Sequence, residues 1–157
     1  MPYPFEFLEP GELEDGDLRL VLIEKGWKPI PPHGAPYYRF EMRHVQEGTR
    51  MGKITLRIGD SETLRYAGHF GFDVDSPYRG HRYAARSVGL LLPFAQRHGL
   101  KEVWIGSPPD NAASRRSCEL AGGVCIETVQ VPKDTDLYEQ GIRLLCRYRI
   151  DLDSRKD

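Results

Sequence analysis

The sequence predicts an α+β (mixed α/β) fold in which strands and helices follow the order β-β-β-β-α-β-α-β-β. Two observations carry this prediction. Several short segments alternate apolar and polar residues, which is typical of strands with one buried face. One central stretch changes to the period of about 3.6 residues that marks an amphipathic helix. Because a strand–helix–strand crossover lies in the middle of the chain, we expect a mixed, mostly antiparallel sheet with one parallel pair.

Length and composition indicate one domain over residues 1–157. Hydrophobic residues make up 39% of the chain and charged residues 29%, which suits a folded core and argues against general disorder. The formal net charge of −1 argues against nucleic acid as the main partner, and no apolar run approaches the roughly 20 residues of a membrane span. The three cysteines and five histidines show no metal-ligand spacing, and the chain starts without a signal-peptide pattern. The expected protein is cytoplasmic and reduced, with no metal, no membrane and no nucleic acid among its partners.

The N-terminal half is expected to hold an irregular leader, residues 1–17, followed by four strands. Alternation begins at Leu18 and ends at Gly26, which gives the first strand. Residues 27–36 contain four prolines and are predicted to be irregular. The remaining strands are expected near residues 38–43, 53–58 and 67–74, the first two joined by a hairpin turn at residues 46–48.

The C-terminal half is expected to hold two helices and three strands. The first helix follows from an apolar stripe formed by Ala84, Val88, Leu91, Leu92 and Ala95, and it should end at Gly99 with a kink at Pro93. Asn111 can cap a shorter second helix that ends at Gly122. Strands are expected at residues 101–105, 124–131 and 142–150. In the last of these, Ile142, Leu144, Cys146, Tyr148 and Ile150 should share one face.

The most informative stretch is residues 74–84, where a strand ends and a helix begins. A short turn containing Gly80 leaves backbone N–H groups unpaired in front of a helix N-terminus, which is a favourable place for phosphate. Arg79, His81 and Arg82 add cationic side chains. The alternative is a surface turn with solvated arginines, because short glycine patterns are weak evidence.

A second set of polar residues lies on the expected second helix. Spacings of three and seven residues bring Asn111, Ser114 and Cys118 onto one helical face, where they could line a cleft. The alternative is that Asn111 is only a cap and Cys118 only a core residue.

Together these motifs resemble the GCN5-related N-acetyltransferase (GNAT) family over roughly residues 50–150. The family's loop, Arg/Gln-x-x-Gly-x-Gly/Ala, is matched by Arg79-Gly80-His81-Arg82-Tyr83-Ala84, and its later Asn-x-x-Ser signature by Asn111 and Ser114. The segment from Cys146 to Ile150 is similar to the last strand of one bacterial branch. The resemblance implies that acetyl-CoA is the acyl donor, with its pyrophosphate on the 79–84 loop, near Asn111 and Ser114. It also implies that the strand at 67–74 splays away from the strand at 101–105, with the thioester in the gap beside Phe72, Asp73 and Val74.

Three departures from the family pattern are visible. Arg82 replaces the middle glycine of the loop, and Cys118 replaces a tyrosine that in many members protonates the departing thiolate. The two helices that usually follow the first strand are missing, and only residues 27–37 lie in their place. We therefore expect an acceptor side that is open or closed by a partner subunit. A homodimer is expected, since the N-terminal region is shortened and Trp27, Tyr37 and Tyr38 should be exposed.

The resemblance implies direct acyl transfer to an amine acceptor. Backbone N–H groups near residues 72–74 would bind the thioester carbonyl as negative charge develops on it. The family's usual glutamate is absent, so His69 and Asp73 are the candidate bases. The alternative is that His69 satisfies a buried hydrogen bond and that Asp73 pairs with an arginine. For the acid, Ser114, Cys118, Tyr138 and solvent water all stay open.

Two functions compete with an active N-acetyltransferase. The missing tyrosine and glutamate favour a catalytically inactive acyl-CoA-binding or assembly module on the same fold. An unrelated α+β domain that binds a phosphate ligand or RNA is the third possibility, and the near-neutral charge balance disfavours RNA.

Overall fold

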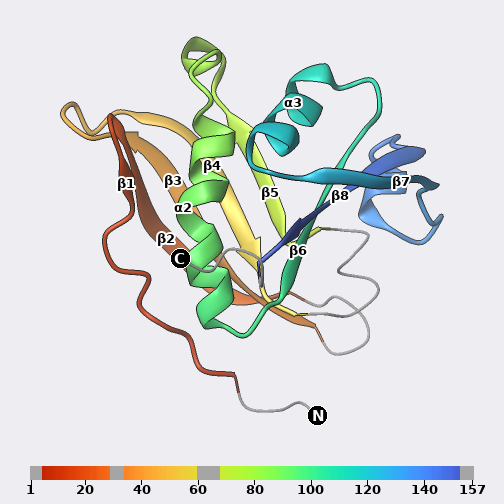
Figure 1. Cartoon of the computed structure of the whole chain (residues 1–157), viewed down its shortest axis with the longest axis horizontal. Coiled ribbons are helices and arrows are strands. Elements are labelled where there is room, and N and C mark those ends of the chain that lie inside the picture. Colours follow the sequence, from red (N-terminus) through yellow and green to blue (C-terminus); the bar gives the residue numbers. More distant parts are fainter. Residues whose placement is uncertain (1–4, 29–33, 60–67, 153–157) are drawn as a thin grey trace.

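The computed structural model describes residues 5–28, 34–59 and 68–152, and these residues form two antiparallel sheets and their covering helices. The first sheet has the order β1-β2-β3-β4-β5 and the second the order β6-β8-β7 (Figure 1). The α+β class and the predicted succession of strands and helices are confirmed, with three short additions: β1, the 3₁₀ helix η1 and α4. The strands are β1 (Glu14–Asp15), β2 (Leu18–Lys28), β3 (Ala35–His44), β4 (Arg50–Arg57), β5 (Phe70–Val74), β6 (Glu102–Ser107), β7 (Val124–Gln130) and β8 (Leu144–Asp151). The helices are η1 (Ser76–Tyr78), α2 (Tyr83–Arg97), α3 (Ala112–Leu120) and α4 (Asp136–Glu139).

Helix α2 covers one face of the first sheet and forms the core with it (Figure 1). Every residue of its predicted apolar stripe, from Ala84 to Ala95, is buried. The helix continues through Pro93, which lies on its exposed side, and Gly99 follows it with the left-handed φ of +89° that ends a helix. The amphipathic period was therefore sufficient to locate this helix and its buried side. None of the helices within the described ranges is long and apolar enough to cross a membrane.

The N-terminal region departs from the sequence prediction in two places. Part of the leader is ordered, because β1 pairs with β2 through Glu14 and Arg19. The first strand does not end at Gly26 but continues to Lys28, and Trp27 pairs with Pro36 of β3. Both ends of the proline-rich segment thus belong to a β-ladder, while residues 29–33, like residues 1–4 and position 67, lie outside the described residues.

The prediction of exposed tyrosines was wrong, although Trp27 is 44% exposed. Tyr37 and Tyr38 are 8% and 0% exposed because β3 is an inner strand of the sheet. The Tyr38 hydroxyl lies 2.7 Å from Nε2 of His98 and accepts a hydrogen bond from the Leu8 N–H, so it ties the leader to the end of α2. Burial and the neighbouring Arg97 lower the pKa of His98, which favours the neutral ring at this contact.

The last strand buries only part of its predicted face. Cys146, Tyr148 and Ile150 are buried, whereas Leu144 is 47% exposed and Ile142 precedes the strand. Arg147, on the opposite face of β8, is also buried, and its guanidinium lies 4.4 Å from the centre of the Trp104 ring. Both faces of β8 are therefore covered in the middle of the strand.

Strands β5 and β6 separate from one another, which positions the functional site. No ladder joins them in the described residues; each instead forms an antiparallel ladder with another strand. They touch at one end, where the His69 N–H donates to the Trp104 carbonyl at 2.7 Å. The expected parallel pair is thus reduced to this contact. Beyond it the strands diverge towards η1 and α3 (Figure 1).

Candidate functional site

A cavity of about 460 Å³ lies between the end of β5, the loop after it, the first turn of α2 and one side of α3. The predicted cofactor contacts all line this cavity except His81, which is exposed and lies beside the Tyr83 ring at a tilted angle. Two sequence motifs that are some thirty residues apart therefore line the same cavity. The lining consists of Phe72, Asp73, Val74, Tyr78, Arg79, Gly80, Arg82, Tyr83, Ala84, Asn111, Ala113, Ser114, Arg116, Ser117 and Leu120.

Backbone donors are concentrated where the loop enters α2. The first helical hydrogen bond runs from the Arg86 N–H to the Arg82 carbonyl at 2.9 Å. In the part of the chain that the structure describes, the N–H groups of residues 80–85 have no acceptor. The first turn of α2 also holds no acidic residue that could occupy these donors. Free N–H groups at the positive end of a helix dipole form a site for an anion such as phosphate.

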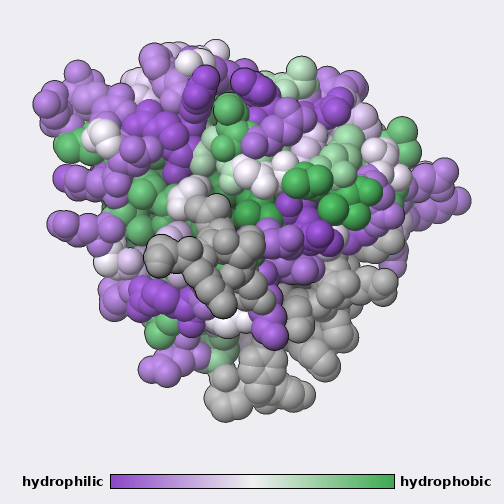
Figure 2. Space-filling view, viewed as in Figure 1, coloured by the Kyte–Doolittle hydropathy of each residue, from purple (hydrophilic) through white to green (hydrophobic). Residues whose placement is uncertain are grey.

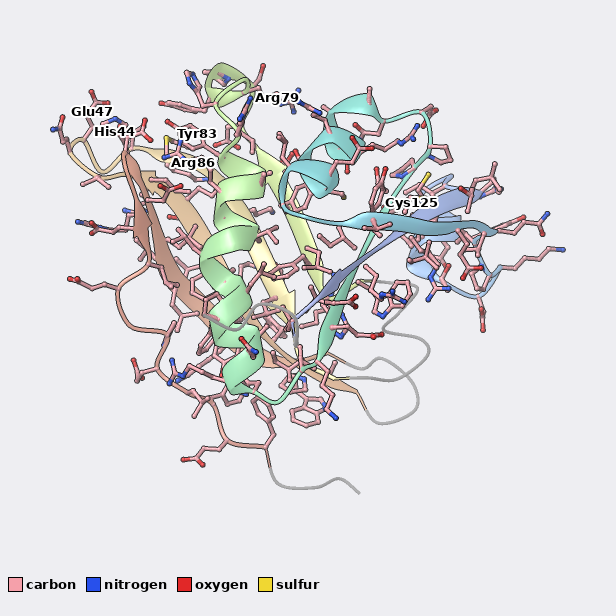
Figure 3. The ribbon with its side chains drawn as sticks, viewed as in Figure 1. His44, Glu47, Arg79, Tyr83, Arg86 and Cys125 are labelled. Atoms are coloured by element: carbon pink, nitrogen blue, oxygen red, sulfur yellow. The ribbon has the colours of Figure 1, made fainter. Side chains whose placement is uncertain are left out.

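Arginines surround these donors from two sides. Arg79 and Arg82 belong to the loop, and Arg116 belongs to α3 on the opposite wall. Arg79 lies on the side of the loop that faces α3 (Figure 3), and its Nε donates to the Val74 carbonyl at 3.0 Å. Asp73 is the acidic residue of the lining. Three guanidinium groups against one carboxylate give the cavity an excess of positive charge, which favours a polyanionic ligand.

Arg82 has a backbone conformation that normally belongs to glycine. With φ of 63° and ψ of 25° it lies in the left-handed region, and it is the one non-glycine residue with a positive φ in the described ranges. This is the loop position at which the sequence departs from the Arg/Gln-x-x-Gly-x-Gly/Ala pattern. The loop therefore keeps the backbone turn of that pattern without the glycine, at a cost of roughly 1–2 kcal/mol.

Two variants of Arg82 separate the effect of its backbone strain from the effect of its charge. Arg82→Gly and Arg82→Ala both remove the guanidinium, but only glycine relieves the left-handed strain. We expect the glycine variant to have a free energy of unfolding about 1 kcal/mol higher than the alanine variant in urea denaturation. Both variants should bind an anionic ligand more weakly than the wild type. A glycine variant less stable than the alanine variant would contradict the strained conformation.

The first turn of α2 is held in place by the turn between β1 and β2. The Tyr83 hydroxyl donates to Oδ2 of Asp17 at 2.7 Å, and Arg86 binds the carboxylates of Asp15 and Asp17 at 2.9 Å each (Figure 3 labels Tyr83 and Arg86). Hydrogen bonds from Tyr83 and Arg86 hold the pKa of Asp17 below its usual value, and burial together with Asp17 raises the pKa of Tyr83. Tyr83 thus uses its hydroxyl to fix the helix start.

His69 is placed as a structural residue. It is 2% exposed, and its Nδ1 accepts the Trp104 N–H at 2.9 Å. Its Nε2 lies 2.6 Å from the Gly59 carbonyl, so Nε2 carries the proton and donates to that oxygen. Both ring nitrogens are engaged with the backbone and His69 does not line the cavity. The geometry matches the alternative in which His69 satisfies a buried hydrogen bond.

The other catalytic candidates lie in three different environments. Asp73 is exposed and lines the cavity. Cys118 is fully buried in the core, and burial raises the pKa of its thiol to about 12. Tyr138 belongs to α4, between the far ends of β7 and β8, and is absent from the cavity lining. Of these residues, Asp73 is the candidate that the fold brings to the cleft.

Several lining residues were not predicted. Ala113, Arg116, Ser117 and Leu120 form a stripe at helical spacing on α3, and Tyr78 belongs to η1. The stripe explains why Cys118 is absent from the lining: at about 100° per residue it lies roughly 160° around the helix from Leu120. Leu120, like Val124 and Ile126 of β7, is an exposed apolar residue, and Figure 2 shows apolar surface in the region of β7. The end of the cleft near Leu120 is therefore apolar, whereas the loop end is basic.

Comparison with solved structures finds the same fold in several acetyltransferases. The ribosomal-protein-S5-alanine acetyltransferase from Vibrio fischeri has a TM-score of 0.61 and 19% identity, over 77% of this chain and 64% of that chain. A Vibrio cholerae protein assigned as a ribosomal-protein-serine acetyltransferase has a TM-score of 0.65 and 15% identity, over 92% of this chain and 99% of that chain. The microcin C7 self-immunity acetyltransferase MccE, solved with acetyl-CoA and AMP, has a TM-score of 0.57 and 13% identity, over 73% of this chain and 61% of that chain. The chain thus spans about two thirds of the length of the Vibrio fischeri protein, and identities this low show a shared fold.

No curated protein sequence matches the chain. The model of the acetyltransferase (GNAT) domain matches residues 6–124, which is more than half of the 157 residues and includes the loop, α2 and α3. The chain therefore belongs to the GNAT acetyltransferase family.

Proposed function

We propose that this protein is an acetyl-CoA-dependent N-acetyltransferase that transfers the acetyl group directly to a primary amine. The observation that carries the proposal is the set of free N–H groups at residues 80–85, flanked by the loop arginines Arg79 and Arg82. A pyrophosphate matches these donors in charge and in hydrogen-bonding capacity. Bound acetyl-CoA would supply an activated thioester, and the residues of the cleft fit the anionic part of this molecule.

Strand β5 supplies further donors beside the cleft. The Asp75 N–H donates to the Met51 carbonyl of β4. Along a strand, the backbone N–H groups of successive residues point alternately to the two neighbouring sides. The N–H groups of Phe72 and Val74 therefore point away from β4, into the space opened by the separation of β5 from β6. Fixed donors of this kind stabilise developing negative charge on a carbonyl oxygen, and removing one such donor typically costs on the order of 3 kcal/mol.

Asp73 is the residue we propose for proton removal from the amine, through a water molecule. It is the carboxylate at the cleft, and β5 holds its backbone in register with Lys53 of β4. Proton transfer by a positioned group typically contributes on the order of 10²–10⁴-fold to the rate. Solvent is the proposed proton donor for the leaving thiolate, because the raised pKa of Cys118 and its burial keep that thiol out of the reaction.

A non-catalytic acyl-CoA-binding module is the second candidate. It is favoured by one observation: of the three side-chain candidates for the acid, Cys118 and Tyr138 do not line the cleft, and only Ser114 does. Binding of the donor without turnover would support this candidate.

Calorimetry and a thiol-release assay test the proposal together. We expect acetyl-CoA to bind and free thiol to appear with at least one amine of a panel of polyamines and of peptides that begin with alanine or serine. Asp73→Asn is expected to lower kcat on the order of 100-fold and to leave the Kd of acetyl-CoA unchanged. Failure to bind acetyl-CoA would overturn the proposal. An unchanged kcat in the variant would remove the role of Asp73.

Self-association and a cytoplasmic location stay predictions. Burial of Tyr37 and Tyr38 removes two of the three exposed aromatic residues on which the homodimer was predicted, and leaves Trp27. Light scattering at micromolar concentration distinguishes a monomer from a dimer.

A further inference from the structure

Resting on the proposed function, we propose that Arg116 reads the 3′-phosphate of coenzyme A and makes the protein selective for coenzyme A over dephospho-coenzyme A. Coenzyme A carries two separate phosphate groups, a pyrophosphate and a phosphomonoester on the ribose. The loop and the start of α2 account for the first of these. Arg116 is the positively charged residue that α3 contributes to the other wall of the same cavity.

The availability of the Arg116 side chain supports this assignment. Its guanidinium is exposed and has no ion pair or hydrogen bond with the described residues. The lining residues before and after it on the same side of α3 are small, Ala113 and Ser117. The Ser117 hydroxyl donates to the Ala113 carbonyl and so remains within the helix. An arginine with five unused N–H donors at an open wall is suited to a phosphate that approaches from the solvent side.

The neighbouring arginine shows the contrast. Arg115 donates to the Tyr148 hydroxyl and to the Pro109 carbonyl, each at 3.2 Å. The hydrogen bond to Tyr148 raises the pKa of Arg115, and the two contacts fix its side chain against β8, outside the cavity lining. Adjacent residues of equal charge therefore have different tasks: Arg115 attaches α3 to the sheet, and Arg116 faces the ligand.

The loop arginines cannot replace Arg116 in this task. Arg79 and Arg82 belong to the segment that contains the N–H donors, so a pyrophosphate bound there lies next to both of them. They neutralise charge that coenzyme A and dephospho-coenzyme A have in common. Only a group away from the loop can respond to the additional phosphomonoester, whose charge is close to −2 at neutral pH.

A comparison of two ligands on three proteins tests the inference. Calorimetry gives the Kd of coenzyme A and of dephospho-coenzyme A for the wild type, Arg116→Gln and Arg115→Gln. We expect the wild type to prefer coenzyme A at least tenfold, which corresponds to about 1.4 kcal/mol. The preference should fall to about one in Arg116→Gln, with the Kd of dephospho-coenzyme A unchanged, and should persist in Arg115→Gln.

The ratio of the two Kd values decides the outcome. Equal wild-type affinities, or a preference that survives in Arg116→Gln, would overturn the role of Arg116 and leave the acetyltransferase proposal in place. Absence of binding for both ligands would overturn both. Because the Arg116 side chain is exposed, Arg116→Gln should unfold at the wild-type temperature, and Arg116→Lys should retain part of the preference.

Discussion

Replacing Gly52 with alanine is expected to lower the free energy of unfolding by about 2–3 kcal/mol. A Cβ atom at this position would lie 2.5 Å from the backbone oxygen of Asp73, 3.0 Å from Cα of Val74 and 3.1 Å from Sδ of Met42. The first two are backbone atoms of β5, which is held to β4 by its ladder, and they cannot move aside as a flexible side chain can. Strand β5 would therefore shift, and because Asp73 and Val74 line the cleft, affinity for acetyl-CoA should fall as well.

Gly71→Ala is the matched control for Gly52→Ala. Gly71 lies on β5 itself, and the nearest atom to an added Cβ is Nη2 of Arg57 at 3.8 Å, an ordinary contact. We expect the free energy of unfolding of this variant, measured in urea, to lie within about 0.5 kcal/mol of the wild-type value. A small increase is also consistent, because alanine reduces the conformational freedom of the unfolded chain. Equal stability of the two variants would show that β4 and β5 are not packed as closely as described.

Reversing both loop charges, with Arg79→Glu and Arg82→Glu in one protein, is expected to weaken acetyl-CoA binding at least about 100-fold. A charge-assisted hydrogen bond contributes about 1.5–3 kcal/mol, and the two carboxylates would in addition repel the pyrophosphate. Both side chains are exposed, so the fold should be retained. Calorimetry measures the affinity, and thermal melting verifies the fold.

The control carries the same change in net charge at a distance from the cleft. Lys101 and Lys133 are exposed and do not line the cavity, so Lys101→Glu with Lys133→Glu tests the long-range field alone. We expect less than a threefold effect on the Kd in 0.15 M salt, where the Debye length is about 8 Å. A similar loss of affinity in both proteins would mean that the loop arginines act at long range and do not contact the ligand.

Local periodicity was sufficient for most of the fold. The stripe from Ala84 to Ala95 located α2 and its buried side, and the alternation from residue 38 onward located β3. The prediction failed at the two ends of residues 27–36, where four prolines indicated irregular structure but Trp27 and Pro36 pair in a ladder. Proline lacks only its own N–H, so it can occupy the end of a strand, and pairing with β2 decides that it does so.

The candidate site was predictable to the extent that it lies within single motifs. The loop from Arg79 to Ala84 was identified because its turn, its charges and the following helix are contiguous in sequence. Arg116 gave no such signal, since the sequence does not show which face of the helix borders the cavity. Helical spacing grouped Cys118 with Asn111 and Ser114, but packing directed Cys118 into the core, and the lining follows the stripe that ends at Leu120.

The elements, their order and the loop at residues 79–84 follow from the sequence alone, because hydrogen bonding within an element and its apolar period act between residues close in the chain. The tertiary structure decided the rest. Asp17 meets Tyr83 across 66 positions, and His69 meets Trp104 across 35. Contacts of this kind form only when β5 and β6 separate and α2 packs on the first sheet, and no local pattern specifies which distant side chains then meet. The same packing places Arg116 opposite the loop, on the second wall of the cleft.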